Sequence, residues 1–408
     1  MRRDSMKYGI MYYKSTDNIG DDIQTYTAVR FLPHIDYHID REDLNCFVPK
    51  EKEHVSMIMN GWFMHNKAAW PPSPYINPLL LSMHFTCLES IDVGEKYLQG
   101  LGGEYLQKYQ PIGCRDIETQ KRLERNNIEN YFSGCMTLTI EPFKNIEKQD
   151  YICLVDLDEK SAKLVKENTK RNIKEITHDV IPEEIEKKSF EQRMQEVENL
   201  LKTYQAAHLV LTNRLHVALP CIALGTPVIL IHKENFEADR LGTYLTYTNS
   251  FSDVEFEKAD IKSILEEPQE NKKDYIKIRE QLIQKCQEFV EKCEKGEVFC
   301  KEELPELEEY KQYVKKIKWY QQLNENIRVK AKKNTYETKR RYKEYEKEIR
   351  KTNEEWAKKY NLLEEENKKL QEEVRMDKEA IEKIYNSKSW KYLEKIRKIK
   401  RGIFKLKK

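Results

Sequence analysis

The sequence predicts an α/β protein in which two domains with parallel sheets face a cleft, followed by a long C-terminal helical segment. Short apolar runs alternate with helical patterns twice over within about the first 300 residues, as in parallel βαβ units with right-handed crossovers. Residues 301–408 are rich in Lys and Glu and contain almost no Gly or Pro. We therefore expect four segments, at residues 1–145, 146–300, 301–385 and 386–408.

The first domain, residues 1–145, opens with an apolar run and the loop STDNIGDD. The run predicts a buried strand, and the loop composition is typical of a helix start. Asp21 or Asp22 could cap that helix by accepting from its first backbone amides. The strands expected in this domain are 8–13, 35–39, 55–59, 111–113 and 131–132, and the helices are 23–32 and 117–125.

The second domain, residues 146–300, repeats the alternation. The strands expected here are 151–155, 173–177, 208–211 and 227–231, and the helices are 161–167, 190–206 and 215–224, with further helices within 260–300 that pack back on this body. The longest apolar run, Val217–Ile231, contains Pro220, Gly225 and Pro227. Such a short, interrupted run predicts a buried core and not a membrane span.

A heptad pattern follows in the C-terminal segment, with spacings that alternate between three and four. Its positions are Tyr360, Leu363, Asn367, Leu370, Val374, Asp377, Ile381 and Ile384. An Asn at an a-type position, here Asn367, is typical of parallel two-stranded coiled coils. We therefore expect a long α-helical coiled coil that forms a homodimer. The alternative is a lone charged helix stabilised by Lys/Glu pairs.

The tail, residues 386–408, carries ten Lys or Arg and one Glu. Its local charge of +9 exceeds the net charge of +2 for the whole chain. Apolar residues alternate with these charges, so an amphipathic helix could make a peripheral contact with an anionic membrane surface. The alternative is a solvated tail. Since the sequence contains no recognised module that contacts nucleic acid bases, we expect no nucleic acid partner.

The nine cysteines are scattered and show no zinc-site spacing. Cys286, Cys293 and Cys300 repeat every seven residues, but neighbours in this series would lie roughly 10 Å apart along a helix and could not share one metal. We expect reduced, partly buried thiols in a cytoplasmic protein, and neither a metal nor a cofactor. The start, MRRDSMKYGIMYY, lacks the apolar segment of a secretory signal.

Arg214 and His216 lie at the turn between an expected strand and an expected helix. Ligands of parallel α/β sheets bind outside the carboxyl ends of the strands. An Arg-x-His at this place is therefore suited to chemistry on an anion. The alternative is a histidine that packs against its neighbours at the helix N-terminus.

Three segments in this order resemble the polysaccharide pyruvyl transferase family. They are DNIGDDIQTYTAVRFL at 17–32, PIGCRDIETQKRLERNNIENYFSGCMTLT at 111–139 and LVLTNRLHVALPCIALGTPVI at 209–229. The resemblance covers roughly residues 6–300. It implies two Rossmann-like domains of the GT-B type. It also implies transfer of an enolpyruvyl unit from phosphoenolpyruvate to a sugar of a surface polysaccharide or its precursor, which forms a pyruvate ketal.

The same resemblance implies a set of site residues. The donor-binding and catalytic positions correspond to Arg115, Arg214, Leu215 and His216, of which His216 is the catalytic candidate. The amino-terminal signature corresponds to Asn18, Gly20 and Asp21, and an inter-domain element to Gly134, Cys135 and Thr137. Cys135 could be a nucleophile, but without a basic neighbour it could simply pack in the core.

The residue types suit this chemistry. Phosphoenolpyruvate carries a phosphate and a carboxylate, and guanidinium groups bind such anions through paired charge-assisted hydrogen bonds. Arg115 and Arg214 could hold the donor across the cleft, with the phosphate at the helix N-terminus near Leu215. His216 could act as acid in one step and base in the next. Arg115 could instead form a surface ion pair with Asp116.

The stretch MIMNGWFMHN, residues 57–66, replaces the Gly-rich loop that many family members have after a strand. Besides Asn18, Gly20 and Asp21, the candidates for an acceptor or donor loop are Asn60, Trp62 and His65. Trp62 and Trp70 could stack on a sugar ring or cover the core. His84 could support the acceptor site.

Two other functions stay open. The same architecture could serve a glycosyltransferase that uses a nucleotide-sugar. It could also serve a non-catalytic scaffold that recruits glycan-assembly enzymes through the coiled coil. The main hypothesis is a transferase in the cytoplasm at the inner face of the membrane, whose partners are phosphoenolpyruvate and a glycan acceptor.

Overall fold

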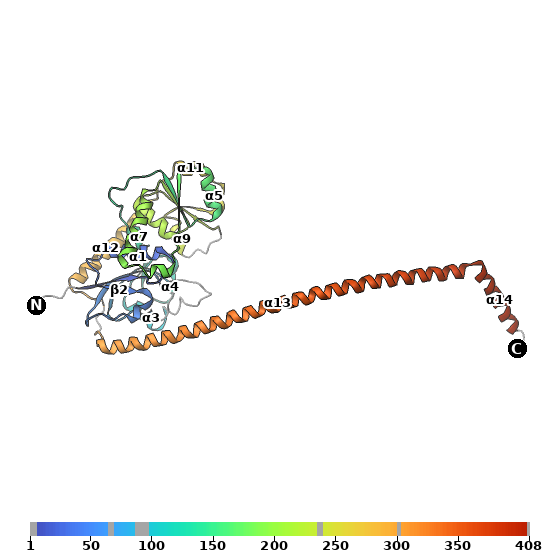
Figure 1. The fold of residues 1–408 in the computed structure, drawn as a ribbon. Coiled ribbons are helices and arrows are strands. Elements are labelled where there is room, and N and C mark those ends of the chain that lie inside the picture. Colours follow the sequence, from blue (N-terminus) through green and yellow to red (C-terminus); the bar gives the residue numbers. More distant parts are fainter. Residues whose placement is uncertain (1–5, 64–68, 86–97, 235–239, 300–302, 406–408) are drawn as a thin grey trace. The chain divides into compact units, whose positions relative to one another are not determined.

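The computed structural model describes residues 6–63, 69–85, 98–234, 240–299 and 303–405. The chain divides into two compact units, Met1–Gln321 and Gln322–Lys408. The first unit contains two sheets whose paired strands run parallel throughout the described residues, with helices between the strands (Figure 1). The prediction of an α/β protein with two parallel sheets is thus confirmed.

The first sheet has six strands in the order β2-β1-β3-β4-β5-β6. Their bounds are β1 Lys7–Tyr12, β2 Tyr37–Asp40, β3 Val55–Phe63, β4 Ile76–Phe85, β5 Ile112–Cys114 and β6 Asn130–Phe132. β3 is buried along nearly its whole length, as a strand covered on both faces of a parallel sheet must be. The chain moves from β1 to β2 and returns to β3 on the other side of β1. The carboxyl ends of β1 and β3 therefore flank a topological switch point.

β4 is a strand that the sequence analysis missed. It begins in a Pro-rich stretch, and Pro78 cannot donate a hydrogen bond to a neighbouring strand. The sheet accommodates Pro78 because β5 pairs with β4 only at Met83 and Cys114. The start of β4 thus has no strand beside it on that edge among the described residues.

Among the described residues, three helices and two short 3-10 segments belong to the half of this unit that contains the first sheet. They are α1 Ile19–Val29, α3 Gly100–Lys108, α4 Ile117–Arg125, η1 Arg41–Cys46 and η4 Met136–Thr139. A further helix, α12 (Ile276–Glu294), returns from the second half and covers the first sheet. Cys286 and Cys293 lie on its buried face, against a cluster that includes Tyr8 and Ile10. The seven-residue repeat of these cysteines thus marks the core side of a helix.

The second sheet has five strands in the order β11-β10-β9-β7-β8. The strands are β7 Tyr151–Val155, β8 Asn172–Ile176, β9 Leu209–Thr212, β10 Val228–His232 and β11 Asn249–Ser252. The helices are α5 Glu159–Asn168, α6 Pro182–Ile185, α7 Phe190–Ala206, α8 Leu215–Leu224, α9 Arg240–Tyr244, α10 Asp253–Lys258 and α11 Ile261–Glu266. Two hydrophobic clusters lie on its two faces. Here the chain leaves β7 for β8 and returns to β9, so the second switch point lies between β7 and β9.

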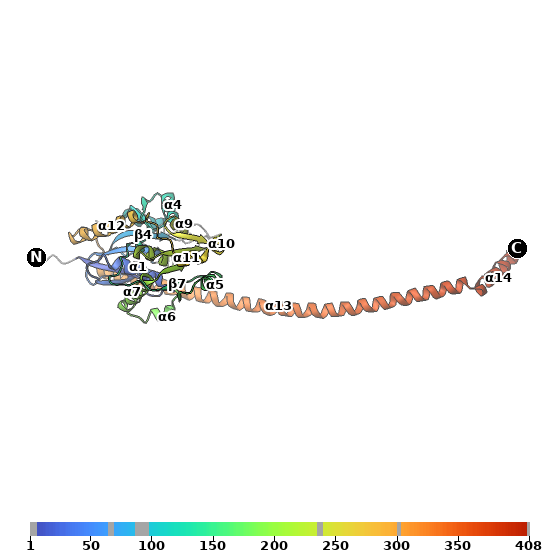
Figure 2. The same cartoon turned by 90° about the horizontal axis from the view of Figure 1, so that it is seen from above.

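The C-terminal helix α13 runs from Leu307 to Asn386 as one continuous element (Figure 1, Figure 2). Its first turns belong to the first unit, where Tyr310 and Val314 pack against Tyr75. α14 (Lys388–Lys405) follows as a separate helix, since the hydroxyl of Ser387 accepts a hydrogen bond from the amide of Trp390 at 3.1 Å. Across the described part of the chain, none of the helices combines the length and the apolar character needed to span a membrane.

Candidate active site

Residues that follow three parallel strands meet at one place in the first unit. Asn18 comes after β1, Arg115 comes directly after β5, and His216 comes after β9. Two of these strands, β1 and β9, flank the switch points of their sheets. The loop after β1 is joined to the second half by backbone pairing between Asn18 and Asp179. Ligands of parallel sheets bind at such carboxyl ends.

His216 lies in the first turn of α8 and is half-buried. Its Nε2 lies 2.8 Å from Gln24 Nε2 and 3.5 Å from Arg115 Nη1. A Cβ added at Gly20 would lie 2.8 Å from His216 Nδ1, so a larger residue there would displace the ring. The structure thus brings together Gly20, Arg115 and His216, which come from the three segments that the sequence analysis singled out.

Gln24 was not predicted as a site residue, yet it contacts several of them. Asn60 Nδ2 donates to its Oε1 at 2.9 Å and to its backbone carbonyl at 3.1 Å. Its own Nε2 lies 3.1 Å from Cys135 Sγ. Cys135 is fully buried, which favours the packing interpretation of this thiol. The signal that could have found Gln24 is its position four residues after Gly20, on the same face of α1.

Arg115 is a buried residue, only 3% exposed. Its amide donates to the Met83 carbonyl at 2.8 Å, and its carbonyl accepts from the Tyr244 hydroxyl at 2.5 Å. Tyr244 belongs to α9, so this hydrogen bond joins the two halves. Burial raises the pKa of the Tyr244 phenol well above its ordinary value, which keeps it protonated as a donor.

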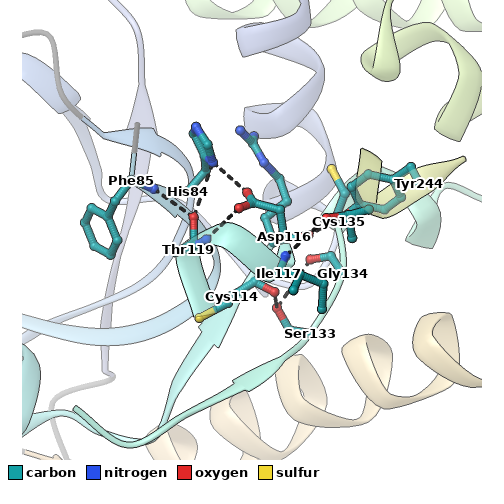
Figure 3. A network of polar contacts seen from close by, with 12 residues as sticks. His84, Phe85, Cys114, Asp116, Ile117, Thr119, Ser133, Gly134, Cys135 and Tyr244 are labelled. Carbon is teal, nitrogen blue, oxygen red and sulfur yellow. Dashed lines mark hydrogen bonds and ion pairs between the residues drawn. The ribbon is translucent and has the colours of Figure 1, made fainter. Parts of the chain in front are cut away.

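Asp116 corrects the expectation of a surface ion pair with Arg115. It is fully buried, and its Oδ2 lies 2.5 Å from His84 Nδ1 (Figure 3). Its Oδ1 caps α4 by accepting from the Thr119 amide at 2.8 Å. Burial acts to raise the pKa of Asp116, but His84, through charge and hydrogen bond, and the charge of Arg115 outweigh it and hold the pKa at about 2. His84 is thus fixed in a buried pair.

The Arg214 guanidinium is engaged by two carboxylates of the second half. Its Nε lies 3.0 Å from Asp156 Oδ2, and its Nη2 lies 2.7 Å from Asp179 Oδ1. Through Asp179 it is connected to the backbone bridge at Asn18. Leu215, the first residue of α8, packs against the core of the second half. A donor-binding role for Arg214 and Leu215 stays a prediction.

The N-cap of α1 is Asn18, whose side chain accepts from the Gly20 amide at 2.8 Å. The prediction that Asp21 or Asp22 caps this helix was wrong. Asn18 has the extended backbone of an N-cap and comes directly before the first helical residue, whereas both aspartates already lie within the helix. Asp21 Oδ2 instead accepts from the Thr16 hydroxyl at 2.8 Å.

Asp22 forms a buried ion pair with Arg193 of α7, which the sequence analysis also missed. Arg193 Nε and Nη2 lie 3.0 and 2.5 Å from the two carboxylate oxygens. Burial raises the pKa of Asp22 to about 6, although Arg193 opposes the shift. The signal was in the helical pattern, because Arg193 precedes Val197 and Leu201 at intervals of four on the buried face of α7.

The tryptophan candidates at the first sheet differ in their surroundings. Trp62 is partly exposed, and the Arg41 guanidinium lies 5.7 Å from its ring centroid. Trp70 is buried and contacts the rings of Phe63, Phe85 and Tyr105. Of the two alternatives for Trp70, the structure therefore supports core packing. His65 lies outside the described residues.

Gly134, which belongs to the inter-domain element together with Cys135 and Thr137, has a packing role. Its carbonyl accepts from the Ser82 hydroxyl at 2.7 Å, and an added Cβ would lie 2.5 Å from Ile278 Cγ2 of α12. Thr137 is buried, with its hydroxyl 3.2 Å from Cys135 Sγ. Within the described ranges the cysteines are free and buried, and no group of three or more His, Cys, Asp or Glu could hold a metal ion.

The model of the polysaccharide pyruvyl transferase family matches residues 18–232, more than half of the chain. The match includes Asn18, Arg115 and His216 and leaves the C-terminal segment outside. The chain belongs to the polysaccharide pyruvyl transferase family. It is therefore a transferase. No curated protein matched the chain.

Several solved structures show weak similarity. A functionally uncharacterised Klebsiella pneumoniae protein is 10% identical, with 60% of this chain and 92% of that chain covered and a TM-score of 0.36. The UDP-GlcNAc 2-epimerase of Methanocaldococcus jannaschii is 11% identical, with 77% and 100% covered and a TM-score of 0.34. The Escherichia coli ADP-heptose heptosyltransferase II is 10% identical, with 69% and 99% covered and a TM-score of 0.27. TM-scores this low give no support to any particular fold type or activity.

Proposed function

We propose that this chain transfers a pyruvyl unit from phosphoenolpyruvate to a sugar of a surface polysaccharide or its precursor and releases phosphate. The observation that carries the proposal is the distance of 3.5 Å between Arg115 Nη1 and His216 Nε2. An anion-binding group and a titratable group therefore share one place. Membership of the family supports the same class of reaction.

Arg115 is the residue that we assign to the anionic donor. Its burial strengthens the charge-assisted hydrogen bonds that a guanidinium makes to phosphate or carboxylate. The first-turn amides of α8 would add donors, because the N-cap residue is Arg214, whose guanidinium has no acceptor for them. Asp179 is 71% exposed, so a second anionic group of the donor could replace it at Arg214.

His216 is the residue that we assign to proton transfer. The enol methylene takes up a proton, and the resulting cation at the neighbouring carbon is captured by one sugar hydroxyl, which loses its proton. A second hydroxyl then displaces phosphate, whose oxygen takes up that hydroxyl's proton as the ketal closes. Imidazole changes its charge near neutral pH. One histidine can therefore give the first proton and receive the proton of the first hydroxyl.

The acceptor sugar is assigned to the end of β3. Trp62 is partly exposed there and offers an aromatic ring for stacking, and Asn60 ties the same strand to the site through Gln24. We also assign two other residues to the acceptor site: His65, which follows β3 in the sequence, and Asp21, at the start of α1. The GT-B type of domain pairing that the resemblance implies is part of the same proposal.

The test uses the purified full-length chain with phosphoenolpyruvate and a panel of glycans. We expect release of inorganic phosphate together with a glycan product that has gained a pyruvate ketal by mass spectrometry. His216→Gln should abolish both signals. His34→Gln, a matched change at a histidine that is 43% exposed and outside the site, should retain them. Phosphate release that His216→Gln leaves unchanged would overturn the role of His216.

Calorimetry separates the donor classes. Phosphoenolpyruvate should bind to the full-length chain, and nucleotide-sugars should not. If a nucleotide-sugar binds and phosphoenolpyruvate does not, the function assigned to this protein would be glycosyl transfer and not pyruvyl transfer. Binding of neither donor, with biological activity that survives His216→Gln, would favour the scaffold hypothesis.

We further propose that the heptad positions of α13 form a parallel two-stranded coiled coil with a second copy of this chain. Leu363, Leu370, Val374, Ile381 and Ile384 are each more than half exposed. These apolar side chains recur at a and d positions, which burial in a partner helix would cover. Asn367 at an a position favours two parallel strands.

Light scattering on the full-length chain tests this dimer. Leu363→Glu combined with Leu370→Glu should halve the measured mass, because it places charges in the a/d interface. Leu362→Glu is the matched control, since Leu362 is 67% exposed but lies off the heptad positions. A wild-type mass equal to one chain would contradict the dimer.

We also propose that α14 lies on an anionic membrane surface at the cytoplasmic face. Leu393, Ile396 and Ile399 are exposed among basic residues, as in interfacial amphipathic helices. The full-length chain should sediment with vesicles that contain phosphatidylserine but not with phosphatidylcholine vesicles. Ile396→Glu combined with Ile399→Glu should reduce the bound fraction. Equal binding to both vesicle types would contradict the proposal.

A further inference from the structure

Gln24, Asn60 and His216 form a chain of hydrogen bonds whose direction is fixed at one end. The Gln24 backbone carbonyl can only accept, so the Asn60 atom that lies 3.1 Å from it must be the NH2 group. The same Asn60 Nδ2 lies 2.9 Å from the Gln24 side chain. That side-chain atom must accept as well, and it is therefore the oxygen of Gln24.

The other end of the Gln24 amide is consequently its NH2 group. It has two hydrogens and two partners, His216 Nε2 at 2.8 Å and Cys135 Sγ at 3.1 Å. Gln24 is 1% exposed, so the burial of this amide requires that both hydrogens are used. Cys135 thus serves as an acceptor that keeps the Gln24 amide in place.

His216 Nε2 faces only donors among these partners. Besides the Gln24 amide, Arg115 Nη1 lies 3.5 Å away, and a guanidinium has no acceptor. A neutral imidazole has one nitrogen that donates and one that accepts. If Nε2 accepts, the proton of neutral His216 resides on Nδ1, the nitrogen beside Gly20.

We propose that Gln24 is a positioning residue, which holds His216, when it is neutral between its two proton transfers, with its proton on Nδ1 and its basic Nε2 toward Arg115. This inference rests on the proposed function, in which His216 transfers protons at a donor held by Arg115. The basic nitrogen would then face the place where the anionic donor binds. Asn60 sets the donor-to-acceptor direction of all these hydrogen bonds without contacting His216.

The first test reads the tautomer directly by NMR of the full-length chain with 15N-labelled histidine. The His216 signals are identified by their loss in His216→Gln. In the wild type at high pH, Nδ1 should show the shift of a protonated ring nitrogen and Nε2 that of an unprotonated one. The reverse pattern would overturn the proposal, whatever reaction the protein catalyses.

Two variants should reverse the donor-to-acceptor direction of this series of hydrogen bonds. In Asn60→Asp the carboxylate can only accept, so the Gln24 amide should turn over and present its oxygen to His216. The proton of His216 should then move to Nε2. Gln24→Glu has the same shape as Gln24 but offers only oxygens, and it should give the same move if Asn60→Asp fails to fold. Unchanged His216 shifts in a folded variant would contradict the proposal.

The second test measures the kinetic constants kcat and KM. Gln24→Met keeps the size of the side chain and removes its three hydrogen bonds, to Asn60, His216 and Cys135. It should lower kcat by about 10- to 100-fold, part of what an acid–base group contributes, and should change KM much less. It should also alter the pH profile of kcat.

The matched control is Gln205→Met, because Gln205 is a buried glutamine that hydrogen-bonds both backbone groups of Phe143, away from His216. It should lower stability and leave the pH profile unchanged. Equal kinetic effects in the two variants would reduce Gln24 to a structural role. Absence of any turnover in the wild type would instead count against the proposed function, while the NMR result would still stand.

Discussion

Arg115 Nη1 lies 3.5 Å from His216 Nε2, although 101 positions separate the two residues in the chain. The first follows β5 of the first sheet, and the second follows β9 of the second sheet. Neither sheet alone holds both groups. The relative placement of the two sheets therefore decides whether an anion can be bound and protonated at the same place.

Substitution of Arg115 should weaken donor binding. Arg115→Met removes charge-assisted hydrogen bonds worth about 1.5–3 kcal/mol each, so the Kd for phosphoenolpyruvate should rise at least roughly 10-fold. Arg115→Lys keeps the charge but loses the paired hydrogen-bond geometry. Its Kd should therefore lie between those of the wild type and Arg115→Met. Calorimetry measures the effect. Arg171→Met, at an arginine paired with Glu266 on the second half, is the control, and an unchanged Kd in Arg115→Met would refute the assignment.

The ion pair between Asp22 and Arg193 should behave as a coupled unit. Arg193→Met leaves a buried carboxylate without its partner and should cost about 3–5 kcal/mol of unfolding free energy at pH 8. The double variant, with Asp22→Asn added, should cost less than the sum of the single changes. Urea unfolding measures all three.

The pH dependence gives a second check on this pair. Burial raises the pKa of Asp22 from 3.8 to about 6, so the folded state favours the protonated carboxyl and the contribution of Asp22 to stability falls as pH rises through about 6. The cost of Arg193→Met should therefore be smaller at pH 5 than at pH 8. Additive costs in the double-variant cycle would show that the two side chains are not coupled.

Gly61 should be the least replaceable glycine of the first sheet. Its φ is +123°, and an added Cβ would overlap the Tyr13 hydroxyl oxygen. Gly61→Ala thus suffers both an unfavourable backbone and a steric overlap. Gly225→Ala is the control, since Gly225 has a φ of +73° but open space around an added Cβ.

Thermal unfolding compares these variants. Gly225→Ala should cost about 1 kcal/mol, the usual penalty of a left-handed residue, and Gly61→Ala should cost clearly more. Tyr13→Phe should recover part of the loss in Gly61→Ala, because it removes the overlapping oxygen. If the two glycine variants unfold at the same temperature, the overlap at Tyr13 has no energetic weight.

His178 should make stability depend on pH. It is buried, with its Nε2 2.8 Å from the Tyr204 hydroxyl, and burial lowers its pKa from 6.5 to about 4. The unfolded chain therefore takes up the proton first, and the stability contributed by neutral His178 is present above pH 6.5 and lost as pH falls toward 4. A shift of this size corresponds to about 3 kcal/mol.

Urea unfolding of the wild type and of His178→Gln at several pH values measures this contribution. The variant has no group that titrates at this position, so its stability should fall less between pH 6.5 and pH 4. Parallel curves for the two proteins would mean that His178 is not the group responsible.

Local sequence patterns predicted much of the fold. Helices α7 and α8 have the bounds expected from the sequence. α7 begins at the capping box of Ser189, and α8 is an apolar run that ends at Gly225. β4 was missed because its proline suggested a loop, and only the short partner strand β5 explains why a proline is tolerated there. The heptad positions lie on the helix α13, as expected.

The candidate site was predictable only in part. Arg115 and His216 were found because they lie in recognisable segments and have side chains suited to an anion. Gln24 was missed because an isolated glutamine carries no chemical signature; its role depends on Asn60 and Cys135, which are 36 and 111 positions away. The cap of α1 was misassigned because four Asx residues compete within one loop, and backbone geometry decides among them.

The return of α12 to the first sheet has a consequence for how the protein is made. The hydroxyl of Tyr8, in the first strand, donates to Glu294 Oε1 at 2.8 Å across 286 positions of the chain. During translation β1 leaves the ribosome long before α12 does, so part of one face of the first sheet stays uncovered until the second half has been synthesised. The half that is synthesised first is therefore the half that is completed last.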